Sequence, residues 1–244
     1  MATKFDSIPA AERIIVALDC GAEEAYRLAD VLAGKATWLK VGMTLYYAEG
    51  PSIVRALKER GFKVFLDLKF HDIPHQVEGA AEAAVATGAD MITMHAAGGV
   101  PMMEAACRGA ARAAEARGAE VPYTLGITVL TSMDDETLRS IGVARQMAEQ
   151  VRGLALLTKE ARLSGVVCSP KEAAELREVL GAEACIVTPG VRPAWAEKGD
   201  QSRVATPAKA FAAGASHLVI GRPITQADDP AEAFARVVAE IEEG

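Results

Sequence analysis

The chain has 244 residues, 50% of them hydrophobic, and a formal net charge of −7 at pH 7. This length is enough to bury a sizeable core, and we expect one domain over residues 1–244. The acidic balance argues against binding to nucleic acid, because a phosphate backbone requires clustered Lys and Arg side chains.

Targeting and redox features predict a cytoplasmic protein. Residues 1–10 contain no apolar stretch of signal-peptide length, and no window reaches the roughly 18 uncharged apolar residues of a membrane span. The four cysteines are scattered without CxxC spacing, which is typical of buried small residues in a reducing compartment. We therefore expect neither secretion nor insertion into a membrane.

Apolar, β-branched runs predict eight strands, which alternate with Ala- and Glu-rich segments of helical spacing. The strands are Arg13–Asp19, Thr37–Gly42, Lys63–Lys69, Met91–His95, Thr124–Leu130, Gly165–Cys168, Cys185–Thr188 and His217–Gly221. The helices are Ala22–Ala33, Ser52–Arg60, Val77–Thr87, Met102–Arg117, Ala144–Leu156, Lys171–Leu180, Pro207–Ala213 and Ala231–Ile241. Eight such units in a chain of this length favour a closed parallel (β/α)8 barrel, the TIM-barrel architecture, over an open doubly wound sheet.

The segment Phe65–Pro74 places two carboxylates and a lysine where an apolar run ends. Residues i and i+2 of a strand share a face, so we expect Asp67 and Lys69 to meet in one pocket. Asp72 lies beyond the strand, and strand geometry does not aim it at Lys69 of its own chain, although a partner subunit could place it there. The structural alternative is an ion pair that closes a barrel strand. We favour a functional site, because charged strand-end residues in parallel α/β folds are often functional.

Other polar residues are expected at the same end of the barrel, because the chemistry of such barrels lies at the carboxyl ends of the strands. The full predicted set is Asp19, Lys40, Asp67, Lys69, Thr131, Arg192 and Arg222. The long segment from Pro189 to about Ala205 is interpreted as a lid or binding loop, with a disordered surface insertion as the alternative. After the last strand, Gly221-Arg222-Pro223 predicts a helix start that binds phosphate.

A metal site and covalent catalysis find little support in the sequence. His71 and His75 have the spacing of a shared helix face, but Pro74 disfavours helical geometry at the residue before it, so no metal site is predicted here. His95 and His217 are expected to be either hydrogen-bonded core groups or groups that contact the residues of the site, rather than catalysts. A Schiff-base role for Lys69 stays open, although two nearby carboxylates suit a proton donor better than a nucleophile.

The segment from Asp67 to Pro74 resembles the signature of the orotidine 5′-monophosphate decarboxylase family, and the resemblance extends from Val16–Asp19 to Val219–Ile224. Further motifs match in the family's order, namely Trp38–Gly42, Thr128–Ser132, Val187–Arg192 and Gly199–Gln201. The match covers nearly the whole chain and is closest to the bacterial branch. It implies a homodimeric (β/α)8 enzyme that converts orotidine 5′-monophosphate to UMP and carbon dioxide in de novo pyrimidine synthesis, without a metal or an organic cofactor.

The resemblance also implies roles for residues at matching positions. Lys69 would be the proton donor and Asp67 its neighbouring carboxylate, while Asp72 would reach into the site of the partner subunit. The substrate-binding positions would be Asp19 and Lys40 for the ribose hydroxyls, Thr131 for the pyrimidine, Gln201, Gly221 and Arg222 for the phosphate, Arg192 in the closing loop, and Ile73 and Gln76. Gln76 departs from the family's usual threonine and brings a longer side chain to that contact.

Two alternatives remain at this point. A related enzyme, 3-keto-L-gulonate 6-phosphate decarboxylase, also has an Asp-x-Lys-x-x-Asp element but depends on magnesium. The second alternative is a non-catalytic barrel that binds a nucleotide monophosphate as a sensor or scaffold. The intact set of Asp67, Lys69 and Asp72 argues against it.

Overall fold

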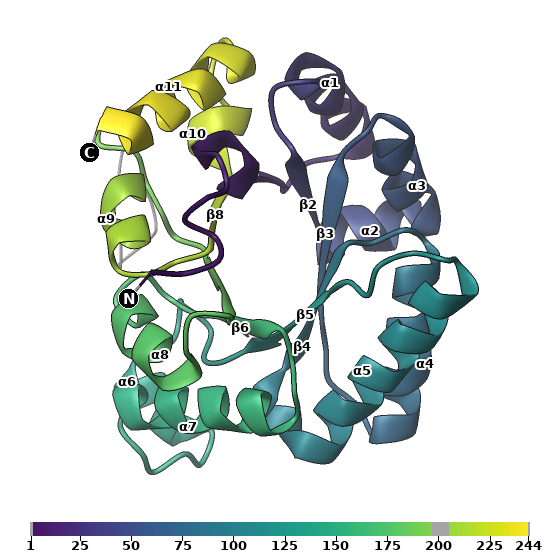
Figure 1. Ribbon diagram of the computed structural model, residues 1–244, viewed down its shortest axis with the longest axis vertical. Helices are drawn as coiled ribbons and strands as arrows, with labels where there is room; N and C mark the ends of the chain where they lie inside the picture. Colours follow the sequence, from purple (N-terminus) through teal and green to yellow (C-terminus); the bar gives the residue numbers. More distant parts are fainter. Residues whose placement is uncertain (1, 197–204, 244) are drawn as a thin grey trace.

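The computed structural model describes residues 2–196 and 205–243, which form a closed parallel barrel surrounded by helices (Figure 1). The strands are β1 (Ile14–Leu18), β2 (Trp38–Gly42), β3 (Lys63–Phe70), β4 (Met91–His95), β5 (Tyr123–Ile127), β6 (Gly165–Val167), β7 (Cys185–Thr188) and β8 (His217–Ile220). Each strand pairs with the next in sequence, and β8 pairs with β1 to close the ring. The predicted (β/α)8 barrel is therefore confirmed.

The helices occupy the predicted segments, with additional short ones. They are η1 (Ala10–Arg13), α1 (Ala22–Leu32), α2 (Met43–Glu49), α3 (Pro51–Glu59), α4 (Pro74–Ala86), η2 (Ala96–Gly98), α5 (Gly99–Ala116), α6 (Asp135–Ser140), α7 (Met147–Glu160), α8 (Ala173–Leu180), α9 (Pro207–Ala212), α10 (Arg222–Thr225) and α11 (Pro230–Glu243). The sequence analysis missed α2 and α6, because helices of 7 and 6 residues are too short to show a clear helical period.

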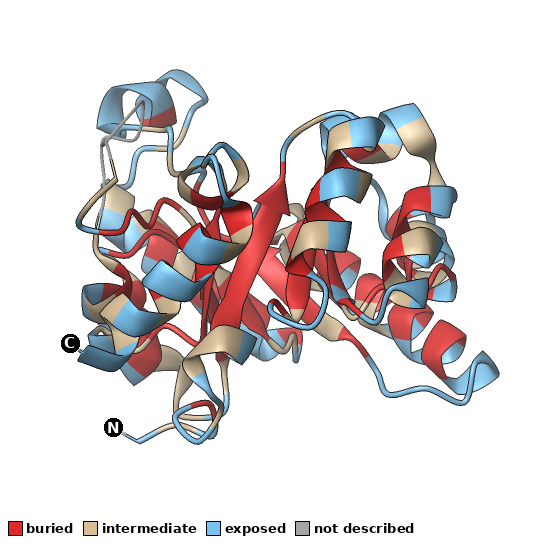
Figure 2. Cartoon of the chain, turned by 90° about the horizontal axis from the view of Figure 1, so that it is seen from above, coloured by how far each residue is buried: buried red, intermediate tan, exposed pale blue. Residues whose placement is uncertain are grey.

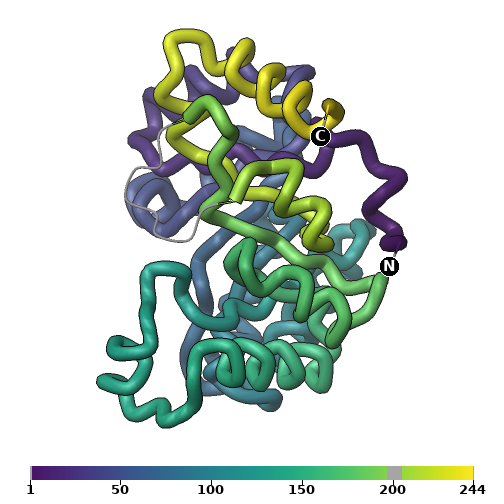
Figure 3. Tube along the Cα trace, turned by 90° about the vertical axis from the view of Figure 1, so that its left-hand side faces the viewer, coloured from purple at the N-terminus to yellow at the C-terminus, as the bar shows by residue number. Residues whose placement is uncertain are grey.

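The fifth strand is shorter than predicted, since β5 ends at Ile127 rather than at Leu130. Thr128 still donates its N–H and its hydroxyl to the carbonyl of Val167, but the chain then leaves the sheet. Val129 and Leu130, which follow, are also apolar. Composition alone therefore did not show that the strand ends at Ile127. The segment that follows carries α6 away from the barrel (Figure 3).

Two apolar layers hold the barrel together, as expected for strands that are buried on both faces. Alternate residues point inward to an inner core of Phe5, Ile15, Ala17, Trp38, Phe65, Met91, Leu125, Cys185, Val187 and Val219. The intervening residues, such as Val16 and Leu39, pack outward against the helices in a second and larger core. Burial is accordingly concentrated in the strands and the inner helix faces (Figure 2). Helix α11 packs against η1 and α1, so the last helix of the chain lies beside its first elements (Figures 1 and 3).

Aromatic rings close the amino end of the barrel around His217, which is 3% exposed. Phe5 and Trp38 each place their ring centroids 5.6 Å from the imidazole, and Tyr123 lies at 6.3 Å, all edge to face. The Cys185 thiol lies 3.7 Å from Nδ1 of the same ring. His217 is therefore a core group, as predicted, and the cavities of the barrel must lie at its other end.

No helix among residues 2–196 and 205–243 is long and apolar enough to cross a membrane.

The buried His217 should make folding stability depend on pH. Burial lowers its pKa to about 3, and the positive charges of Arg13 and Lys63 add to the effect. Between that value and the ordinary 6.5, the unfolded chain binds a proton that the folded chain excludes. This group should therefore leave the free energy of unfolding unchanged above pH 6.5 and lower it by on the order of 1 kcal/mol per pH unit below that.

Urea unfolding from pH 7 to pH 4, at fixed protein concentration, checks this expectation. His217→Phe removes the titrating group. In this variant the free energy of unfolding should fall less steeply with decreasing pH, by the contribution of about one proton. Equal slopes for wild type and His217→Phe would show that His217 is not the cause.

Candidate active site

A cavity of about 660 Å³ opens at the carboxyl ends of the strands, a volume typical of small-molecule sites. Eight of the predicted residues line it: Asp19, Lys40, Asp67, Lys69, Thr131, Arg192, Gly221 and Arg222. Strand alternation explains part of this set, because Lys40 follows the inward-facing Trp38 by two residues and Asp67 follows the inward-facing Phe65 by two. The barrel thus brings residues from six strands and their loops to one site.

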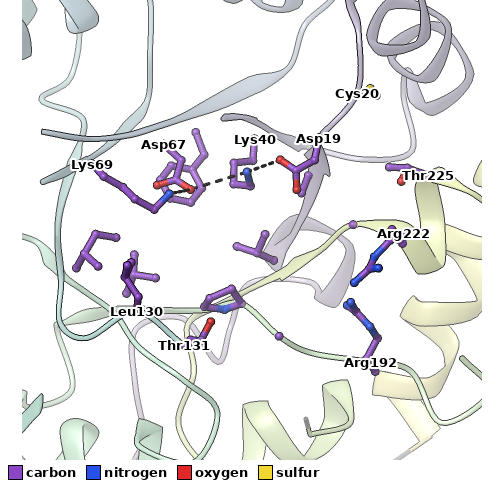
Figure 4. A pocket seen from close by; sticks show the side chains of 18 of the residues that line it. Asp19, Cys20, Lys40, Asp67, Lys69, Leu130, Thr131, Arg192, Arg222 and Thr225 are labelled. Carbon is purple, nitrogen blue, oxygen red and sulfur yellow. Dashed lines mark hydrogen bonds and ion pairs between the residues drawn. The ribbon is translucent and has the colours of Figure 1, made fainter. Parts of the chain in front are cut away.

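Four charged side chains form a continuous array along one wall of the cavity (Figure 4). Lys69 Nζ lies 2.8 Å from Asp67 Oδ2, Lys40 Nζ lies 3.8 Å from the same oxygen, and Lys40 Nζ donates to Asp19 Oδ1 at 3.0 Å. The side chains of Lys40 and Asp67 are only 10% and 12% exposed. A buried charge is stable only when it is paired and hydrogen-bonded. The alternation of signs therefore allows four charges to share a small volume.

Gly42 leaves the space that this array occupies. A Cβ atom added there would lie 3.2 Å from Lys40 Nζ and 3.3 Å from Asp19 Oδ1, which is tighter than ordinary van der Waals contact. Any side chain at position 42 would therefore press on the junction of these two groups.

Lys69 and Asp67 meet as predicted, but regular alternation is not the full reason. Strand β3 contains an irregularity: Leu66 pairs with Ile92 and Phe70 with Met94, so four steps along β3 match two along β4. Within it, Lys69 adopts φ +55°, a left-handed conformation that costs a non-glycine residue about 1 kcal/mol or more. Bulges of this kind re-aim side chains near active sites, and here the bulge directs the ammonium group back to Asp67.

Thr93 lies opposite this bulge and is completely buried. Its hydroxyl oxygen accepts a hydrogen bond from the backbone N–H of Lys69 at 3.0 Å and donates to Asp67 Oδ1 at 2.9 Å. The other carboxylate oxygen of Asp67 faces the two ammonium groups. Both oxygens of this carboxylate are therefore held in fixed directions.

Two guanidinium groups mark the end of the cavity away from Lys69. Arg192 follows β7 and is 9% exposed, with one of its nitrogens donating to the carbonyl of Val191 at 3.1 Å. Arg222 begins α10 directly after Gly221, so a helix starts where the sequence predicted one. The two side chains reach toward one another (Figure 4). An electropositive region after strands 7 and 8 suits a phosphate group.

Three predicted residues do not line the cavity of this chain. Asp72, Ile73 and Gln76 are exposed, and Ile73 is 64% exposed. Asp72 accepts a hydrogen bond from the N–H of Ile73 at 2.7 Å, which turns the chain into α4 and away from Lys69. This placement agrees with the expectation that strand geometry alone does not bring Asp72 to its own site. Gln201 lies outside the described residues, as do the other residues of 197–204 within the segment interpreted as a lid.

The histidines near the site do not form a metal-binding pair. Helix α4 begins at Pro74, so His71 precedes the helix that contains His75. The His71 ring instead lies 5.5 Å from that of His95, centroid to centroid. Burial, and secondarily the charges of His71 and Lys69, lower the pKa of His95. Within residues 2–196 and 205–243, no three His, Cys, Asp or Glu side chains are grouped as metal ligands.

The sequence analysis missed several residues of the site. Cys20, Glu24, Thr225 and Gln226 also line the cavity. Thr93 was missed because threonine is common in strands and only the pairing of β3 with β4 reveals what its hydroxyl contacts. The other four follow recognised strand ends, and extending the search by five residues would have found them.

Comparisons with known proteins agree with this geometry. The model of the "Orotidine 5'-phosphate decarboxylase / HUMPS family" matches residues 12–237. An orotidine 5′-phosphate decarboxylase from Moorella thermoacetica is 52% identical over 235 residues, which cover 96% of this chain and 93% of the relative. One from Alkalilimnicola ehrlichii is 52% identical over 230 residues, covering 94% and 96%.

Solved structures show the same similarity. The crystal structure of orotidine 5′-phosphate decarboxylase from Lactobacillus acidophilus aligns with a TM-score of 0.85 at 38% identity, covering 94% of this chain and 99% of that one. An uncharacterized conserved protein from Geobacillus kaustophilus aligns with a TM-score of 0.83 at 42% identity, covering 93% and 99%.

Proposed function

The chain belongs to the orotidine 5′-phosphate decarboxylase / HUMPS family, and from this premise we propose how its residues carry out the reaction. It decarboxylates orotidine 5′-phosphate to UMP and carbon dioxide in pyrimidine biosynthesis, the activity for which its relatives of about 50% identity are named. The observation that carries the mechanism is the array of Lys69, Asp67, Lys40 and Asp19 in one wall of the cavity.

The difficulty of the reaction lies in the electron pair that remains on C6 of the pyrimidine when the bond to the carboxylate breaks. The ring carbonyls cannot delocalise that pair directly, so stabilisation must come from charge that is already in place. An ammonium group beside C6 supplies such charge. We assign this role to Lys69, which then transfers a proton from Nζ to C6 while carbon dioxide leaves.

Asp67 has two roles in this proposal. Its carboxylate orients the Lys69 ammonium group through the 2.8 Å contact. It would also lie near the substrate's carboxylate, where repulsion between two negative charges disfavours the bound substrate more than the transition state. Lys40 neutralises part of the charge on Asp67 from the other side and, with Asp19, is placed to bind the ribose hydroxyls.

The phosphate is assigned to the opposite end of the cavity, between Arg222 and Arg192, with Gly221 at the same turn. Gln201 is proposed to join this grip. Thr131 also lines the cavity and is proposed to contact the pyrimidine. A phosphate held far from C6 supplies binding energy that can be used to order the site and exclude water.

We further propose that the enzyme is a homodimer and that Asp72 completes the site of the partner subunit, together with Ile73 and Gln76. The exposure of residues 71–76 supports this, because among the described residues these charged and apolar side chains lie outside the cavity that contains Lys69. Exposed apolar side chains follow the neighbouring strands β2 and β3, with Met43, Tyr47 and Ile73 at 44%, 74% and 64% exposure. Such side chains are typical of an interface core.

The remaining proposals concern the whole chain. The family match over residues 12–237 supports a single domain over residues 1–244. Four cysteines outside any disulfide are consistent with a cytoplasmic location. Neither nucleic acid nor membrane is proposed as a partner, and no cofactor or metal ion is proposed to take part. The magnesium-dependent alternative and the non-catalytic barrel are less favoured, since the relatives of about 50% identity carry the decarboxylase name.

The first test follows the ultraviolet absorbance of orotidine 5′-phosphate mixed with the purified protein in EDTA. Wild type should consume the substrate, and Lys69→Ala should lose at least about a thousandfold in kcat, because it removes both the charge and the proton donor. Arg108→Ala, at an exposed residue of α5 outside the cavity, serves as the control. Loss of the wild-type activity in EDTA with recovery in magnesium would favour the phosphosugar alternative, and no activity in either would contradict the assignment.

A hybrid dimer tests the shared site. Lys69→Ala and Asp72→Asn should each be inactive alone, but a mixture that exchanges subunits contains hybrids in which one site has both native residues. At equal amounts the mixture should recover about one quarter of wild-type activity, because half the dimers are hybrids with one intact site each. If Lys69 and Asp72 act within the same chain, no activity should return.

Truncating the phosphate grip tests whether remote binding energy contributes to turnover. Arg222→Ala should raise KM and also lower kcat by about tenfold or more, because phosphate contacts help to order the site in the transition state. Steady-state kinetics of the variant decide the point. A change confined to KM would mean that the phosphate contributes equally to ground state and transition state.

A further inference from the structure

The hydroxyl of Thr93 connects the two groups that the proposed mechanism uses most directly. It donates to Asp67 Oδ1 at 2.9 Å and accepts from the Lys69 backbone N–H at 3.0 Å. A hydroxyl has one proton to give and lone pairs to accept with, so both bonds form at once. Together with the 2.8 Å contact between Lys69 Nζ and Asp67 Oδ2, they close a ring of three residues.

The bulge in β3 explains why this hydroxyl is needed. Four steps along β3 match two along β4 between the pairs Leu66↔Ile92 and Phe70↔Met94. Backbone groups inside such a bulge lose their regular partners in the ladder, and a buried N–H without a partner is costly. Thr93 is the β4 residue between the two paired positions, and its side chain supplies the acceptor that the Lys69 N–H would otherwise lack.

Because Thr93 is buried, the hydrogen bonds of its hydroxyl cannot be taken over by water. Its side chain faces the barrel interior, as does that of Met91 two residues earlier. Thr93 is 0% exposed, so water cannot readily replace its hydroxyl if it is removed. The left-handed φ of +55° at Lys69 also requires support, because such conformations persist only when the surroundings impose them.

We propose that Thr93 is a positioning residue for decarboxylation: its hydroxyl fixes the rotation of the Asp67 carboxylate and the backbone of Lys69, so that the ammonium group is aimed at the reacting carbon. This inference rests on the proposed roles of Lys69 and Asp67. It predicts that Thr93 affects kcat, because small misplacements of reacting groups are costly. Substrate affinity should change little, because the phosphate and ribose contacts come from other strands.

The experiment compares Thr93→Val, which keeps the shape of the side chain but removes the hydroxyl, with Thr93→Ser, which retains it. Thr124→Val is the matched control. Thr124 lies on the neighbouring strand β5, is 4% exposed, and also accepts a backbone N–H, from Ser164 at 3.3 Å. Its hydroxyl lies outside the cavity, so this variant loses a buried hydroxyl without touching the site.

Steady-state decarboxylation, UMP affinity by calorimetry and urea unfolding are measured on all variants. Thr93→Val should lower kcat about 10- to 100-fold, with KM and UMP affinity within about threefold of wild type. Thr93→Ser should restore most of kcat, and Thr124→Val should affect stability alone. Thr93→Val with wild-type kcat, a serine variant as impaired as the valine variant, or an equal loss in Thr124→Val would each overturn the inference.

Two further comparisons keep the result decisive. If Thr93→Val does not fold, Thr93→Cys takes its place, because a thiol of similar size is a weak donor. This variant should lower kcat at least about fivefold. Full activity of Thr93→Cys would contradict the inference. Wild type and Lys69→Ala are assayed alongside. Inactive wild type would refute the proposed function, whereas active wild type with unaffected Thr93 variants would refute only the role of Thr93.

Discussion

The carboxylate of Asp67 is the group on which the site depends. It is nearly buried, and it is stable there because Lys69, Lys40 and Thr93 surround it. A buried anion without partners would be costly to the fold, so its neighbours are held in place by the same interactions that neutralise it. The array is therefore ordered before substrate arrives, and such preorganised charge is what the reaction needs.

The barrel creates this environment by separating two kinds of interior. At the amino ends of the strands, aromatic rings surround His217, and burial keeps that imidazole uncharged. At the carboxyl ends, inward positions carry Lys40 and Asp67 instead of apolar side chains. Between them, the inner core excludes water from below the cavity. The charges consequently act in a medium of low polarity, where they interact more strongly than in water.

The two ends of the cavity have different charge patterns and, in our proposal, different tasks. The array beside Lys69 alternates in sign and can respond to charge that develops on a reacting carbon. The region of Arg192 and Arg222 holds two guanidinium groups that point toward one another and suits a group whose charge does not change during the reaction. Separating constant from developing charge allows binding energy from one end to support chemistry at the other.

The sequence by itself determined the barrel and eight of the residues in the cavity, because the period of burial and the succession of strands and helices can be read along the chain. It also predicted that Asp67 and Lys69 meet, but by regular alternation, which is only part of the reason. Only the tertiary structure revealed the bulge at Lys69 and the contact of Thr93 with Asp67, since both arise from the register between β3 and β4. The sequence predicted that strand geometry does not aim Asp72 at Lys69 of its own chain, but only the tertiary structure showed where Asp72 lies, on the surface, because loop direction depends on contacts between distant segments.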